Sequence, residues 1–101
     1  MTTLTRPNPC FTLGHITATP AALDALTELN YPPLALLNRH RRGDWGDLDD
    51  EDVQRNNDAL MDGSRLLSAY IIQNIMFWVI TEAMDDSGDR ATTTILLPSE
   101  Y

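Results

Sequence analysis

One apolar run, from Arg65 to Met84 (RLLSAYIIQNIMFWVITEAM), constrains the fold of this chain more than any other feature. Many of its side chains are β-branched, which suits a pleated strand better than a helix. The polar pair Gln73-Asn74 interrupts the run where a two-residue turn is natural and where a membrane helix would bury two amides. The run therefore predicts two antiparallel strands, Arg65–Ile72 and Ile75–Met84, rather than a membrane span.

The predicted turn also fixes which residues face each other across the hairpin. One face carries the pairs formed by Ile72 and Ile75, Tyr70 and Phe77, and Ser68 and Val79. The opposite face carries Leu67, Ala69, Ile71, Met76, Trp78 and Ile80. Since both faces are apolar, both are expected to need cover. Helices can cover one face, and we expect a second subunit or a partly exposed patch on the other.

The segments around the hairpin predict three helices and two more strands. We expect strands at Phe11–Thr17 and Ala91–Leu97. We also expect one helix that begins at Pro20 and two more, at Pro33–Arg42 and at about Asp49–Asp62. The resulting order, β-ααα-βββ, predicts an α+β fold: an antiparallel sheet of about four strands with helices packed on one face. Residues 1–10 are expected to form a flexible N-terminal arm, and residues 11–101 a single domain.

The charge balance is strongly acidic. Seven arginines and no lysine stand against 15 acidic residues, a formal net charge of -8. This balance disfavours nucleic-acid binding and favours partners with basic surfaces, although solubility alone also accounts for it. The N-terminal residues MTTLTRPNPC lack the apolar core of a signal peptide, so we expect a cytoplasmic protein. The single Cys10 excludes an internal disulfide framework.

Most of the acidic residues lie between Asp44 and Asp62. An EF-hand loop counted from Asp47 would need Gly at its sixth position and Glu at its twelfth, where the chain has Asp52 and Asp58. We therefore expect no metal site. Two interpretations remain: a solvated helix start, as the helix dipole favours, or an acidic surface that imitates the phosphates of DNA.

Other candidate functional residues have ordinary alternatives. The cluster Arg39-His40-Arg41-Arg42 suits phosphate binding, or charge pairing with its helix end and nearby carboxylates. Cys10 and His15 would point to opposite faces of a strand, and no glycine-rich phosphate loop, CxxC pair or HExxH motif is present, so we expect neither an enzyme nor a cofactor. Trp45 is interpreted as a lid on the core or as an anchor for a partner, and Tyr101 as packing back on the sheet.

Five blocks of the sequence carry a resemblance: FTLGHITATPAALDAL (11–26), GDWGDLDDED (43–52), RLLSAY (65–70), WVITEA (78–83) and TTTILLPSEY (92–101). On these blocks the chain resembles a family of small uncharacterised bacterial proteins encoded on plasmids and integrative elements. It departs from the family pattern at Met84–Asp89, where the usual turn is shorter, and at Gln73-Asn74, where a turn with glycine is usual. The resemblance implies a mobile-element setting, and it carries over no catalytic residue. Some members are labelled restriction-system subunits, which does not fit a chain this short.

Our leading hypothesis is a non-enzymatic accessory protein of a mobile element that acts by protein–protein contact, for example by inhibiting a DNA-binding or defence protein. The expected interaction residues are Trp45, Asp47, Asp49, Asp50, Glu51, Asp52 and Asp58. One alternative is a structural homodimer joined through the sheet face that carries Trp78 or Tyr70. Another is a weak nucleic-acid-binding module that uses Arg39–Arg42.

Overall fold

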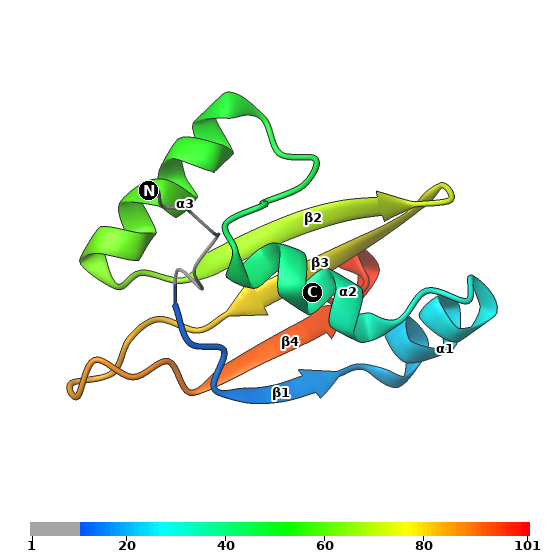
Figure 1. Ribbon diagram of the computed structural model, residues 1–101, viewed down its shortest axis with the longest axis horizontal. Helices are drawn as coiled ribbons and strands as arrows, with labels where there is room; N and C mark the ends of the chain where they lie inside the picture. The colour runs from blue at the N-terminus through cyan, green and yellow to red at the C-terminus, as the bar shows by residue number, and fades with distance from the viewer. Residues whose placement is uncertain (1–10) are drawn as a thin grey trace, which may run out of the picture.

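The computed structural model describes residues 11–101 and shows a four-stranded sheet with three helices (Figure 1). Its elements are β1 (His15–Ala18), α1 (Pro20–Glu28), α2 (Pro33–Arg41), α3 (Asp50–Asp62), β2 (Leu66–Ile72), β3 (Ile75–Thr81), β4 (Thr92–Leu96) and the short 3₁₀ helix η1 (Pro98–Glu100). This order confirms the predicted α+β class. The expected N-terminal arm lies outside the described residues.

The hairpin of β2 and β3 has the predicted register. Tyr70 pairs with Phe77 and Ile72 with Ile75. Gln73 and Asn74 both take positive φ angles, 48° and 73°, as a tight hairpin turn between twisted strands requires. The two amides therefore form the turn itself, which is why they interrupt the apolar run.

The sheet is mixed rather than antiparallel throughout. Its strand order is β1-β4-β3-β2, and β1 runs parallel to β4, whereas the other neighbours are antiparallel. A strand separated from the meander by three helices can enter the sheet in either direction, so local pattern does not fix its orientation. β1 also starts later than predicted, because Gly14 takes a φ of 65° and a Cβ there would lie 2.2 Å from the carbonyl oxygen of Arg90.

Capping residues mark the start of α1 and both ends of α3. Thr19 accepts a hydrogen bond from the backbone N–H of Ala22, and Asp49 accepts one from that of Asp52. Gly63 closes α3 with a φ of 83°. Caps of this kind satisfy backbone groups that a helix end leaves unpaired.

Two of the helices cover one face of the sheet. In Figure 1, α2 lies in front of the strands, α1 lies beside their right-hand ends, and η1 lies behind β3. The core beneath α1 and α2 consists of Ala22, Leu26, Leu36, Leu37, Tyr70, Phe77, Val79 and Ile95. α3 instead lies along the outer edge of β2, over a smaller cluster of Trp45, Ala59 and Leu66. None of the helices in residues 11–101 has the length and apolarity to cross a membrane.

Candidate functional site

The acidic residues predicted to bind a partner differ in what their side chains do. Four of them have hydrogen-bond partners within the chain. Asp47 accepts from the backbone N–H of Ile71 at 2.9 Å, Asp49 caps α3, Asp52 pairs with Arg55 at 2.9 Å, and Asp58 accepts from Gln54 at 2.9 Å. Asp50 and Glu51 are exposed and bond to no side chain of residues 11–101. These two carboxylates are therefore the ones available to a partner without loss of a structural contact.

Trp45 is a lid on the core. Its side chain is 5% exposed, packs with Ala59 and Leu66, and donates its indole N–H to Asn57 at 3.1 Å. The chain bends sharply beside it, where Gly46 takes a φ of 79° and a Cβ would lie 2.1 Å from the carbonyl oxygen of Ala69. This burial agrees with the lid interpretation and leaves little of the ring exposed for use as an anchor.

The outer edge of β2 is closed by side chains and backbone from the preceding segment. Asn56 accepts from the backbone N–H of Leu67 at 3.1 Å and donates to its carbonyl at 2.7 Å. Further along, Trp45 and Asp47 bond the backbone of Ala69, and the Asp47 side chain takes the N–H of Ile71. An unpaired strand edge invites another strand, and this one is already occupied, so a partner is not expected to extend the sheet here.

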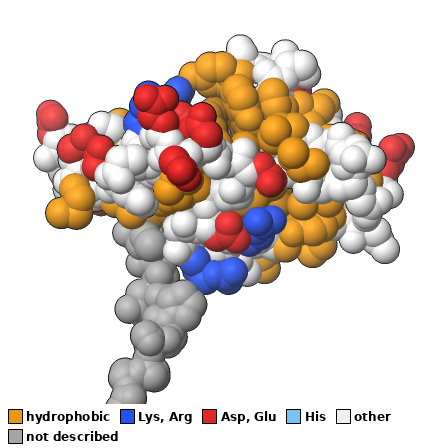
Figure 2. Space-filling view, turned by 90° about the horizontal axis from the view of Figure 1, so that it is seen from above, with side chains coloured by type: hydrophobic (Ala, Val, Ile, Leu, Met, Phe, Trp, Pro, Cys, Tyr) orange, Lys and Arg blue, Asp and Glu red, His pale blue; other side chains and the backbone are white. Residues whose placement is uncertain are grey.

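The face of the sheet turned away from α1 and α2 carries an apolar surface. We call Leu67, Ile71, Met76, Trp78 and Tyr101 the open-face patch. Ile71 is 50% exposed and Tyr101 66% exposed, while the other three are partly exposed. Tyr101 packs edge-on against Trp78 at 5.6 Å, as expected from its terminal position. Figure 2 shows hydrophobic side chains gathered beside the acidic side chains on the surface seen from above.

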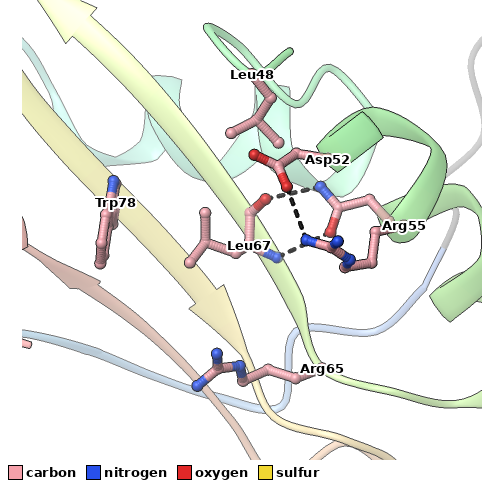
Figure 3. Close-up of a pocket in the computed structure, with 7 residues that line it drawn as sticks. Leu48, Asp52, Arg55, Arg65, Leu67 and Trp78 are labelled. Carbon is pink, nitrogen blue, oxygen red and sulfur yellow. Dashed lines mark hydrogen bonds and ion pairs between the residues drawn. The ribbon is translucent and has the colours of Figure 1, made fainter. Parts of the chain in front are cut away.

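A groove separates the start of α3 from the open-face patch. It encloses ≈ 310 Å³ and is lined by Leu48, Asp52, Arg55, Asn56, Arg65, Leu67 and Trp78 (Figure 3). Leu48, Leu67 and Trp78 supply its apolar walls. Asp52, Arg55 and Arg65 place charges around it. The groove therefore combines apolar contact with charge, as ligand pockets do.

The sequence cluster Arg39-His40-Arg41-Arg42 is divided by the fold. Arg39 forms an ion pair with Asp44 at 2.8 Å and lies over the ring of Tyr70 at 4.4 Å. This hydrogen-bonded guanidinium lowers the pKa of Asp44. Arg42 is exposed at the end of α2, and the Nε atom of Arg41 is buried. The expected charge pairing with Asp44 is confirmed for Arg39, and the cluster does not form one continuous basic surface.

His40 is fully buried in a chain of hydrogen-bonded side chains. Its Nδ1 lies 2.5 Å from the hydroxyl of Ser68 and its Nε2 2.8 Å from that of Thr81, which contacts the Thr93 hydroxyl at 2.7 Å. Thr93 donates to the carbonyl of Leu13, so Thr81 donates to Thr93 and accepts from His40 Nε2–H. When the imidazole is neutral, its Nδ1 accepts from the Ser68 hydroxyl. Burial, and then the nearby positive Arg90, lower the pKa of His40 to about 3.

Arg90 is a buried cation that sequence reasoning did not single out. It donates to three backbone carbonyls, those of Ser64, Glu82 and Ala59, at 2.7, 3.0 and 3.1 Å. The Ala59 carbonyl belongs to the last turn of α3, where a positive charge favours the helix dipole. Burial lowers the pKa of Arg90. The side chain therefore ties the end of α3 to β3, a role that no local pattern reveals.

Among residues 11–101, no three His, Cys, Asp or Glu side chains lie close enough together to hold a metal ion. Comparisons with protein-family models, with curated proteins and with solved structures give no match. The resemblance to mobile-element proteins thus stays a prediction. The groove and the open-face patch are the candidate functional surfaces.

Proposed function

We propose that this chain acts by binding another protein, as a small acidic accessory protein of a mobile genetic element. One observation supports this most directly. The open-face patch has no α-helix over it among residues 11–101, and across the groove from it lies the acidic first turn of α3. An apolar centre beside a charged rim is the usual composition of a protein interface.

The charge of the chain indicates the partner's chemistry. At a net charge of -8, the molecule attracts basic surfaces and repels nucleic acid. Proteins that bind DNA, including defence nucleases, present such basic surfaces. A chain that covers one of them with its acidic rim would compete with DNA, so the proposed activity is inhibition of a DNA-binding or defence protein.

The test is capture of the partner at low and high salt. The tagged chain is incubated with host lysate, and retained proteins are identified by mass spectrometry. We expect a basic DNA-processing protein that is retained at low salt and released at high salt, because screening weakens charge attraction. Retention of no such protein at low salt would contradict the proposal.

Matched variants separate charge from structure. D50N/E51Q removes two exposed carboxylates that bond to no side chain of residues 11–101, and D86N/D89N removes two from the exposed loop after β3. We expect D50N/E51Q to weaken binding to the captured protein by about tenfold, and D86N/D89N to leave it within about twofold. Equal effects of the two variants would contradict a role for the start of α3.

Self-association is the second candidate, and the same open-face patch favours it. A twofold dimer would bury Ile71 and Tyr101 of each copy against the other. Light scattering at increasing protein concentration measures it directly. A monomer mass at every concentration would remove this candidate and leave the apolar patch to a different protein.

A further inference from the structure

We propose that the groove between α3 and the open face binds a small organic carboxylate with an apolar or aromatic body. Nothing in the proposed protein–protein function requires this ligand. Three properties of the groove fit such a ligand: its charge, its apolar walls and its size.

The charge of the groove is opposite to that of the molecule. Two guanidinium groups, of Arg55 and Arg65, line it with a single carboxylate, that of Asp52. The local charge is therefore positive in a chain whose net charge is -8. Five other acidic residues adjoin Asp52 in sequence or lie on the same helix, namely Asp49, Asp50, Glu51, Asp58 and Asp62, and none of them lines the groove.

Arg65 is the cation best placed for an anion. Its side chain is exposed, it donates to the hydroxyl of Tyr101, and it forms no ion pair with any carboxylate of residues 11–101. A guanidinium has five N–H donors and matches a carboxylate in a two-pronged geometry. Arg55 already donates one such hydrogen bond, to the Asp52 carboxylate at 2.9 Å. An incoming carboxylate therefore finds unused donors on Arg65 first.

The walls of the groove select an apolar body for that anion. Trp78 stands on one side and Leu67 beside it, with Leu48 above, as Figure 3 shows. The Trp78 ring presents a flat surface on which an aromatic ring can pack. The enclosed ≈ 310 Å³ lies at the lower end of the size of ligand pockets, which indicates a compact molecule rather than a nucleotide or a long chain.

The test uses 3-phenylpropanoate as the probe, with two matched compounds. 3-Phenylpropanamide keeps the ring and removes the charge, and propanoate keeps the charge and removes the ring. The chain has two tryptophans, so a ¹H–¹⁵N spectrum contains two indole N–H signals. Trp78 lines the groove, whereas the indole N–H of Trp45 is bonded to Asn57, and W78F assigns the two signals.

We expect 3-phenylpropanoate to shift the Trp78 signal with a Kd of about 1 mM or tighter and to leave the Trp45 signal in place. Both matched compounds are expected to bind at least about tenfold more weakly, since each lacks one of the two contacts. R65Q should weaken binding by about tenfold or more, and R55Q should also weaken it. R42Q removes the same charge from an exposed position outside the groove and should change the Kd by less than about twofold.

Three results would overturn the proposal. The first is no shift of the Trp78 signal at probe concentrations well above the expected Kd. The second is equal binding of the amide and the carboxylate, which would remove the role of the guanidinium groups. The third is an unchanged Kd in both R65Q and R55Q. Capture of a protein partner is measured separately and is unaffected by any of these results.

Discussion

At the scale of single residues, His40 shows how surroundings decide the role of a side chain. Its neighbours in sequence are arginines, which suggests a basic surface, yet its ring is fully buried and bonded to Ser68 and Thr81. A histidine beside a serine also resembles a catalytic pair. Here the ring is fully buried and both nitrogens are hydrogen-bonded to neighbouring hydroxyls, so these bonds contribute to the stability of the fold.

The lowered pKa of His40 makes a definite prediction for stability against pH. The folded pKa, about 3, lies below the ordinary value of 6.5 that applies when the chain unfolds. The unfolded state therefore binds the extra proton between these values, and stability is complete above the ordinary pKa and falls as the pH drops below it. We expect wild type to lose about 1 kcal/mol of unfolding free energy between about pH 6 and about pH 5 from this group.

Urea unfolding of two variants checks this prediction. H40Q replaces the buried ring with an amide that can still donate and accept, and it should lack this part of the pH dependence. H15Q changes an exposed histidine on β1 and should retain it. The same loss between the two pH values in H40Q and in wild type would contradict the assignment to His40.

At the scale of elements, the outer edge of β2 shows how the segment Trp45–Asn56 is used. The loop at Gly46 pairs with Ala69, and the side chains of Asp47 and Asn56 complete the edge on either side. The acidic stretch therefore contributes hydrogen bonds to the sheet as well as surface charge. This double use limits which acidic residues can be changed without loss of structure.

Asn56 is expected to be the most sensitive of the edge-closing side chains. N56A removes both bonds to Leu67 and leaves its N–H and C=O unpaired, so we expect a loss of about 2 kcal/mol in unfolding free energy. Q54A removes an exposed contact with Asp58 on the same helix and should cost about 0.5 kcal/mol or less. Denaturant unfolding measures both. A similar small cost for N56A would show that water replaces the two bonds.

Two glycines with nearly the same φ angle separate steric blocking from backbone strain. Gly46 has a φ of 79° and Gly88 one of 83°, but a Cβ on Gly46 would meet the carbonyl of Ala69 at 2.1 Å, whereas one on Gly88 meets nothing within 4 Å. We expect G88A to cost about 1 kcal/mol from the left-handed φ alone. G46A should cost more than about 3 kcal/mol, because it also breaks the pairing with β2. Equal melting temperatures of the two variants would contradict this account.

What sequence could predict follows from the range of the interactions. The hairpin turn and its register depend on neighbouring residues, and both were predicted correctly. The direction of β1 and the burial of Arg90 depend on contacts between distant segments, and neither was predicted. The same limit applies to the candidate site. The groove joins Leu48 and Asp52 to Arg65 and Trp78, and no spacing in the chain brings these residues together.

At the scale of the whole molecule, the sheet has two unlike faces. One is covered by α1 and α2 and holds the core, and the other presents the open-face patch. The alternation of side chains along β2 and β3 makes both faces apolar. Among residues 11–101 no α-helix covers this face, so the face is either exposed to a partner or tolerated as a patch.

The open-face patch can be tested by making it polar without disturbing the strands. I71T/M76T changes a cross-strand pair on this face to threonines, which are β-branched and retain strand preference. Ile71 is half exposed, so we expect the double variant to lose about 2 kcal/mol or less of unfolding free energy. Binding to the captured partner, or self-association if that is observed, should weaken by at least about tenfold, because the apolar centre of the contact is removed.

The control for this variant removes exposed apolar side chains from the covered side of the molecule. L23Q/L34Q changes two exposed leucines, on α1 and α2, and should leave binding within about twofold. Affinity is measured by titration of the purified partner, and fold integrity by thermal unfolding of each variant. If I71T/M76T binds like wild type while remaining folded, the apolar face has no part in recognition. Loss of binding in L23Q/L34Q alone would move the interface to the helices, on the opposite side of the sheet.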